Sequence, residues 1–202
     1  MVELFGRQDL GPISVAADLV YGWSNWDASR SLPTLSRAAS ATFDSKELRG
    51  DLRVEYRIPL GAAWVAPYGQ LELRHFKFDG FNEQGAGAVG LSVKEASHTI
   101  LTPTLGAKVG STMDTGFGRI RPEAAVSYTF NVNEDSFRDV AFEGAPGQGF
   151  RLQGVDPKGF AKFQLGLNAD IGSHAGAFVR GSYATGGGYD NASIRAGIVI
   201  GF

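Results

Sequence analysis

The residues from Glu47 to Ile58 alternate strictly between charged and apolar side chains. Successive side chains of a β-strand point to opposite faces, whereas a helix would scatter the same residues around its circumference. This stretch therefore predicts a strand with one charged face and one apolar face. The apolar set is Leu48, Gly50, Leu52, Val54, Tyr56 and Ile58, and the charged set is Glu47, Arg49, Asp51, Arg53, Glu55 and Arg57.

The same period-two pattern recurs along the chain, and no segment shows a convincing helical period. Each segment is about as long as the ~9–11 residues that a tilted strand needs to cross a bilayer. We therefore predict one all-β domain over residues 1–202, an antiparallel up-and-down transmembrane β-barrel with about eight strands. The predicted strands are 13–26, 44–58, 63–78, 98–111, 118–130, 159–171, 175–186 and 191–202.

The connections between these segments alternate between long and short as far as 187–190, which is short where a long one is due. Bacterial outer-membrane barrels have short periplasmic turns and long outer loops. On that rule Ile13 and Phe202 both lie at the periplasmic end, which requires an even number of strands between them. Three prolines inside predicted strands, Pro67, Pro103 and Pro122, argue against regular pairing at those points. The short connections are 59–62, 112–117, 172–176 and 187–190, and the long ones are 27–43, 79–97 and 131–158.

The alternation alone does not say which face is buried. The apolar face would be the core of a soluble sandwich, but it would be the lipid-facing outside of a membrane barrel. The charged row alternates in sign and can form ion pairs with charges on other strands, which favours a water-filled interior. The predicted lumen-lining charges are Arg49, Asp51, Arg53, Glu55, Arg57, Glu72, Arg74, Arg119, Arg121 and Glu123.

Aromatic residues gather near the ends of the predicted strands. Membrane barrels carry such aromatic girdles at both interfaces with water. This position favours the membrane over a soluble sheet. The predicted interfacial aromatics are Tyr21, Trp23, Trp26, Tyr56, Trp64, Tyr128 and Phe130.

Composition narrows the functional classes. The chain has no cysteine, which excludes disulfides, thiol nucleophiles and Cys-based metal sites, and its net charge of −2 gives no reason to expect nucleic-acid binding. Its three histidines, His75, His98 and His174, lack metal-ligand spacing. We therefore predict no metal, no cofactor and no enzymatic activity. An enzyme at the outer rim, with His98 near Glu83, is an alternative that hydrolase assays on His98→Ala would decide.

The two ends of the chain carry different information. Residues 1–10 lack the basic and then apolar segments of a signal peptide, so we expect a piece of a longer precursor or a degenerate reading frame. The last eight residues have a polar residue, a glycine two positions later, then a hydrophobic residue and a terminal aromatic. This arrangement is typical of an outer-membrane assembly signal, because the last strand offers a free edge for pairing. The residues are Arg195, Gly197, Ile200 and Phe202.

From about residue 13 to its end, the chain resembles the C-terminal translocator domain of autotransporters. Each matching stretch is weak evidence on its own, but together the stretches indicate this family strongly. The resemblance implies a twelve-stranded barrel in the bacterial outer membrane that exports an N-terminal passenger, assembled by the outer-membrane assembly machinery after periplasmic chaperones. Only eight strands are predicted here, and no passenger is present. The stretches are 21–30, 48–57, 67–68, 79–86, 105–106, 121–123, 142–146, Phe150 and Gly154.

A second interpretation remains open. Eight strands enclose an interior that side chains can just fill. The chain could therefore be a small self-contained outer-membrane barrel that serves as an adhesin or a structural anchor.

Overall fold

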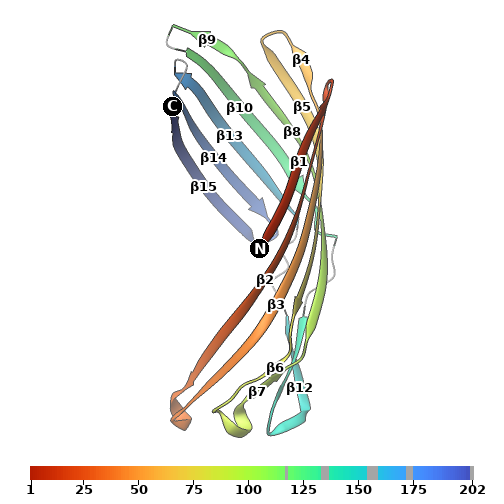
Figure 1. Cartoon of the computed structure of the whole chain (residues 1–202), viewed down its shortest axis with the longest axis vertical. Helices are drawn as coiled ribbons and strands as arrows, with labels where there is room; N and C mark the ends of the chain where they lie inside the picture. Colours follow the sequence, from red (N-terminus) through yellow and green to blue (C-terminus); the bar gives the residue numbers. More distant parts are fainter. Residues whose placement is uncertain (117, 133–136, 154–158, 172–174, 201–202) are drawn as a thin grey trace.

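A computed structural model describes residues 1–116, 118–132, 137–153, 159–171 and 175–200. Nine long strands lie side by side in chain order and form one curled antiparallel sheet (Figure 1). Two short strands pair with β5 and β10 at the sheet's turn end, namely β4 (Ile58–Leu60) and β9 (Met113–Thr115). The long strands are β1 (Val2–Leu10), β2 (Ile13–Leu32), β3 (Arg37–Tyr56), β5 (Ala63–Phe78), β8 (Ala96–Ser111), β10 (Gly118–Thr129), β13 (Phe160–Ile171), β14 (Ala175–Gly186) and β15 (Tyr189–Ile200).

The prediction of all-β, antiparallel, up-and-down architecture is confirmed, but the predicted number of strands is wrong. The additional strand is β1, which pairs with β2 from Val2 opposite Tyr21 to Leu10 opposite Ile13. A tight turn joins the two strands, and Gly11 provides its positive φ of 64°. The sequence did not predict β1 because its alternation is broken. Phe5 is apolar, although it occupies the same alternate positions as the charged Arg7.

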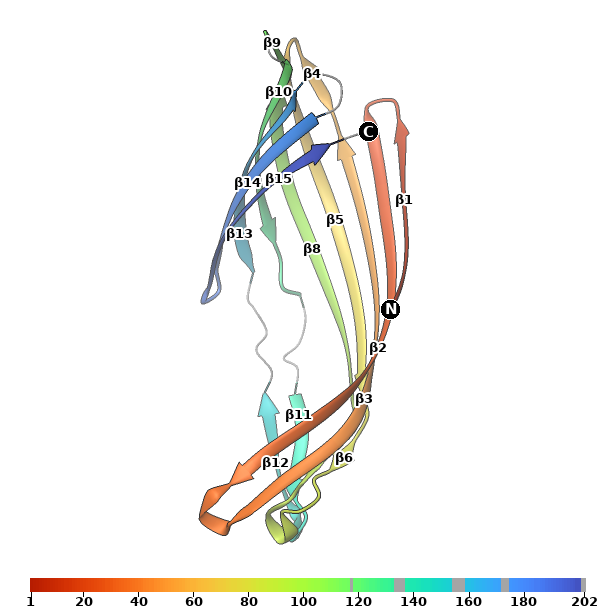
Figure 2. The same ribbon diagram turned by 60° about the vertical axis from the view of Figure 1, so that its left-hand side comes forward.

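The sheet is curled but open. β1 and β15 form its two margins, and within the described residues neither strand pairs with the other (Figure 2). The structure therefore does not show a closed eight-stranded barrel. Each margin presents the unpaired backbone groups of an edge strand.

The three prolines inside strands lie where the backbone ladder is interrupted. On one side β5 pairs with β3 as far as Tyr68 and with β4 from Val65, and Pro67 lies in the gap between these two ladders. Pro103 and Pro122 are each one residue beyond the two ends of the ladder between β8 and β10. A proline has no N–H to donate, so these positions tolerate it without a lost ladder bond.

Two of the three predicted long loops contribute strands to a second, small sheet. It lies next to the far end of the β2–β3 hairpin in both views (Figures 1 and 2). The third loop, 27–43, is largely an extension of β2 and β3 themselves, closed by the 3₁₀ turn Pro33–Leu35. A second 3₁₀ turn, Gly87–Val89, precedes β7. The small sheet has the order β12-β11-β7-β6, with β6 (Phe81–Asn82), β7 (Leu91–Val93), β11 (Phe137–Phe142) and β12 (Ala145–Gln153).

Few apolar side chains are buried in the part of the chain that the structure describes. Leu52, Val54 and Leu167 are 47%, 43% and 45% exposed, although each belongs to the apolar face of its strand. A large exposed apolar surface on an isolated soluble protein would be unfavourable, whereas lipid covers such a surface in a membrane barrel. The buried apolar residues among those described are Ala39, Ala41, Ala66, Tyr68, Ala86, Val93, Val140 and Ala184.

Candidate functional site

The pairing register places the predicted charges on one face of the main sheet. Asp51 pairs with Glu72, and Arg53 with Gln70, so the side chains of each pair lie on the same face. The neighbouring Leu52 pairs with Leu71 on the opposite face. The charged and the apolar side chains that alternate in the sequence therefore lie on opposite faces of the sheet.

The charged face is the concave one. It is hollowed over about 480 Å³ across β3, β5, β8, β10 and β13. Hydroxyl, amide and charged groups provide most of its lining, and Tyr68 and Phe160 add two aromatic rings. The lining residues are Arg53, Tyr68, Gln70, Glu72, Thr102, Thr104, Ser127, Thr129, Phe160, Lys162 and Gln164.

A network of ion pairs crosses the concave face. Glu55 is its least exposed carboxylate, and it lies 2.8 Å from Lys108 Nζ and 3.3 Å from Arg53 Nη2. Arg121 makes two bonds of 2.7 Å to Asp170. The Glu55–Lys108 and Arg121–Asp170 pairs join strands that are distant in sequence, whereas Arg53–Glu55 lies within β3. Such a network fits a polar surface facing water. The remaining pairs are Arg49–Asp18, Arg74–Glu47 and Arg74–Glu72.

Four members of this network were not among the predicted lumen-lining charges. They are Asp18, Glu47, Lys108 and Asp170. Each lies on the polar set of its own strand, so the alternation identified its face. Its partner depends on the register between strands, which the sequence does not specify.

Other predicted lumen-lining charges lie outside the network. Arg57 stacks over the ring of Trp64, with 3.9 Å from its Cζ to the ring centroid. Arg119 bonds Asp114 beside the turn between β9 and β10. Glu123 is exposed and pairs in register with Gly110 and Gly166.

The predicted interfacial aromatics divide between the two faces. Tyr21, Trp23 and Tyr56 lie on the convex, apolar face, on the same alternation as Leu52. Tyr128 lies on that face of β10, and Phe130, one residue beyond the end of the strand, contacts it edge to face, with ring centroids 4.8 Å apart. Their interfacial role remains a prediction.

Trp26 and Trp64 are on the concave face, not on the face that an interfacial girdle requires. Trp64 pairs with Gly110, and its ring occupies the space above that glycine. Trp26 pairs with Phe43 and donates its Nε1–H to Ser45 Oγ at 2.8 Å. The prediction was wrong for these two because it used position along the strand without checking which face the alternation gives.

The predicted assembly signal lies on the margin strand β15. Arg195 and Gly197 are on the concave face, opposite Arg180 and Phe178 of β14. Ile200 is the last residue of β15, while Phe202 lies outside the described residues. The role of these residues in assembly remains a prediction.

The small sheet and the hairpin are joined by an ion pair beyond the main sheet. Arg30 Nε donates to Glu83 Oε1 at 3.2 Å, and the Leu91 N–H donates to Glu83 Oε2 at 3.0 Å. The Arg30 hydrogen bond holds the pKa of the Glu83 carboxyl below its ordinary value, and the Leu91 bond acts in the same direction. Glu83 is thus occupied as a structural acceptor, and His98 instead bonds the Phe137 carbonyl at 3.1 Å.

Two features are absent from the part of the chain that the structure describes. It contains no cluster of three or more His, Cys, Asp or Glu side chains arranged to hold a metal. It also contains no helix with the length and apolar character needed to cross a membrane.

Comparison with known proteins assigns the fold to a family. The chain is similar to the translocator domain of the autotransporter NalP from Neisseria meningitidis, with 21% identity and a TM-score of 0.70. That match covers 99% of this chain and 66% of the NalP chain, so the chain spans a little under two thirds of that domain. No curated protein matches. The family model for the autotransporter beta-domain matches residues 1–182. The chain therefore belongs to the autotransporter beta-domain family, and its location is the bacterial outer membrane.

Proposed function

We propose that residues 1–202 form a single β-domain that provides most of the wall of a translocator pore and supports the export of an N-terminal passenger. The observation that carries this proposal is the curled sheet with an apolar convex face and a charged, hollowed concave face. Such a wall can face lipid on one side and a hydrated polypeptide on the other. The domain would act by enclosing a path, without catalytic chemistry.

Closure of the pore requires further strands between β1 and β15. An open sheet edge inside a bilayer leaves backbone groups without partners, which is costly in hydrocarbon. A twelve-stranded barrel, which family resemblance implies, would need about three strands beyond the nine long ones seen here. The share of the NalP chain that the match leaves uncovered is of the right size to contain them.

The test is a chimera in which the first three strands of the NalP translocator domain, with a signal sequence and an epitope-tagged passenger, precede residues 1–202. We expect a heat-modifiable barrel and an epitope that added protease removes from intact cells. A matched chimera carrying Leu52→Arg should lose both, because a charge on the lipid face opposes insertion. A heat-modifiable barrel whose epitope stays in the periplasm would contradict the proposal.

Assembly would require the outer-membrane assembly machinery and periplasmic chaperones. β15 is a margin strand, and an unpaired edge can be recognised by adding a strand. We propose that Arg195, Gly197, Ile200 and Phe202 direct this step. Removing Phe202 from the chimera should lower the amount of heat-modifiable barrel, whereas an equal amount would exclude the terminal aromatic from the signal.

A further inference from the structure

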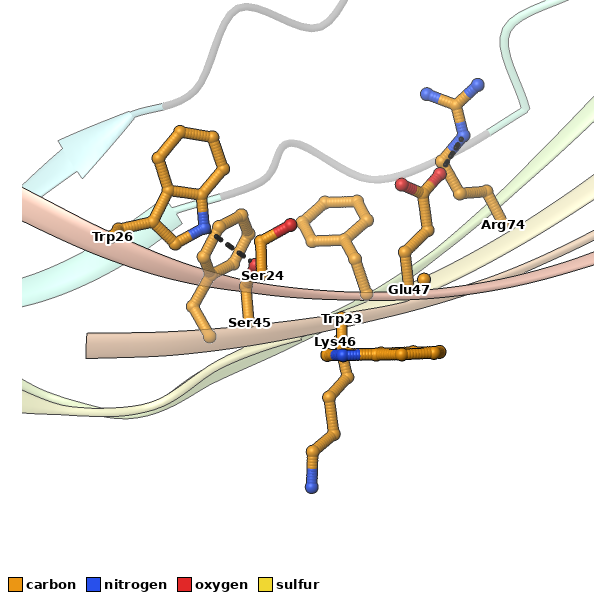
Figure 3. A pocket seen from close by; sticks show the side chains of 10 residues that line it. Trp23, Ser24, Trp26, Ser45, Lys46, Glu47 and Arg74 are labelled. Atoms are coloured by element: carbon orange, nitrogen blue, oxygen red, sulfur yellow. Dashed lines mark hydrogen bonds and ion pairs between the residues drawn. The ribbon is translucent and has the colours of Figure 1, made fainter. Parts of the chain in front are cut away.

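A second hollow lies on the concave face of the main sheet, where β2, β3 and β5 continue toward the small sheet (Figure 3). Its volume is about 280 Å³. Three of its four aromatic rings lie on the concave face, and Trp23 borders the hollow from the other face. Two hydroxyls and an ion pair form its polar part. The residues that carry the argument are Trp26, Phe76, Phe78, Ser24, Ser45 and the pair Glu47–Arg74. We propose that this hollow binds a hexopyranose ring of a neutral saccharide.

The indole of Trp26 is fixed in position before any ligand arrives. Its Nε1–H donates to Ser45 Oγ at 2.8 Å, and its ring lies nearly parallel to Phe43, at 16° with centroids 6.5 Å apart. Phe43 in turn stacks on Phe81 at 4.7 Å. Trp26 remains 49% exposed, so an apolar surface is still free. A pyranose has one face of C–H groups, which contacts a flat aromatic surface favourably.

The polar side of the hollow suits the hydroxyl edge of the same ring. Glu47 Oε1 lies 3.2 Å from Arg74 Nε, and Arg74 Nη2 is also held by Glu72 at 3.1 Å. Planar carboxylate and guanidinium groups can bond two adjacent hydroxyls at once. The hydroxyls of Ser24 and Ser45 lie on the same side of the strands as this ion pair (Figure 3).

The charges select a neutral ligand. Arg74 contacts the two carboxylates Glu47 and Glu72, and Arg138 lies over the ring of Phe78 with its Cζ 4.0 Å from the centroid. The positive and negative groups therefore balance around the hollow, which gives no net attraction for phosphate, sulfate or carboxylate groups. Lys46 and Trp23 also border the hollow, but their side chains extend from the opposite face of the strands (Figure 3). A polypeptide segment is the competing occupant, but this small hollow with a polar floor matches one amphipathic ring better than a continuous chain.

The test measures saccharide binding to the full chain refolded in dodecylphosphocholine, a detergent without a sugar headgroup. The double variant Trp23→Phe/Trp64→Phe leaves Trp26 as the single tryptophan of the three in the chain. We expect maltotriose to change its fluorescence saturably, with half-saturation on the order of millimolar. Saturation-transfer NMR on the otherwise unchanged chain should show the same binding.

The variants separate this site from general effects. Trp26→Ala should weaken maltotriose binding at least about tenfold, and Glu47→Gln, which keeps the shape of the side chain, should also weaken it. Tyr21→Ala, on the same strand but on the opposite face and outside the lining of the hollow, should bind like the unchanged chain. Circular dichroism confirms that each variant keeps its sheet, and if Trp26→Ala loses it, Glu47→Gln decides alone.

Three results would overturn the proposal. The first is no saturable response to maltotriose below about 100 mM, and the second is equal binding by the decisive variant and the unchanged chain. The third is displacement of maltotriose by the tripeptide Gly-Trp-Gly at a lower concentration, which would identify the hollow as a polypeptide site. None of these results depends on whether the domain exports a passenger.

Discussion

The ring of Tyr68 covers the backbone of Gly106 on the neighbouring strand, and a Cβ added at Gly106 would stand 2.5 Å from the tyrosine Cζ. Tyr68 is buried, and the Arg53 guanidinium stacks on its ring with its Cζ 3.8 Å from the ring centroid. The ring therefore contacts both a cation and a position that only glycine can occupy without displacing it.

Gly106→Ala should destabilise the folded sheet by about 1–3 kcal/mol, because the added methyl group displaces a well-packed ring. The measurement is the free energy of urea unfolding in detergent or lipid. Gly69→Ala is the matched control, since the nearest atom to its Cβ is Leu105 Cδ2 at an ordinary 3.6 Å. In Tyr68→Ala, the further change Gly106→Ala should cost much less. Equal costs in both backgrounds would contradict the contact.

Two ion pairs of similar chemistry should differ in their contribution to stability. Glu55 has a side chain only 16% exposed and contacts both Lys108 and Arg53, so Glu55→Gln should cost about 1–3 kcal/mol. The Arg121–Asp170 pair is 43% exposed on each side, so Asp170→Asn should cost less than about 1 kcal/mol despite its bidentate geometry. Urea unfolding of both variants checks the order, and a larger cost for Asp170→Asn would reverse it.

The contact between the hairpin and the small sheet should weaken in acid. The pKa of Glu83 is lowered from its ordinary 4.5 in the folded state, chiefly by the Arg30 hydrogen bond. Its stabilisation is therefore complete above that value and is lost as the pH falls through the lowered pKa. Amide exchange at Leu91, whose N–H bonds Glu83, should accelerate in that window relative to amides of β13.

Glu83→Gln should remove this pH dependence at Leu91, because the amide keeps an acceptor but cannot ionise. Glu95→Gln is the control, since Glu95 pairs with Lys77 at an exposed site, whereas the Leu91 N–H bonds Glu83. An unchanged acid response in Glu83→Gln would assign the effect to another group.

Much of the fold follows from alternation in the sequence. The segment Glu47–Ile58 identified its own two faces, and the same pattern gave β2, β5, β8, β10, β13, β14 and β15 at near their observed places. β1 was missed because nine residues with Phe5 on the polar set give too weak a pattern. The extensions of β2 and β3 were missed because Ala39 and Ala41, though buried, do not stand out among small and polar neighbours.

The pairing within the site was less predictable than its faces. Lys108 lies 53 residues from Glu55 in sequence, and only the register of β3, β5 and β8 brings the two side chains together. The charge alternation therefore predicted a polar face but not its network. The aromatic hollow at Trp26 was also not predicted. It combines residues of β2, β3 and β5, and the register between these strands decides which of them lie side by side.

The central claim is that the apolar convex face contacts lipid while the charged concave face contacts water. The chain has no cysteine, so single cysteines at Leu52, Arg53, Val54 and Glu55 can be spin-labelled one at a time in the bilayer-inserted chimera. We predict that labels at Leu52 and Val54 are relaxed by lipid-soluble oxygen and those at Arg53 and Glu55 by a water-soluble nickel chelate. The opposite assignment, or no alternation along these four positions, would contradict the account.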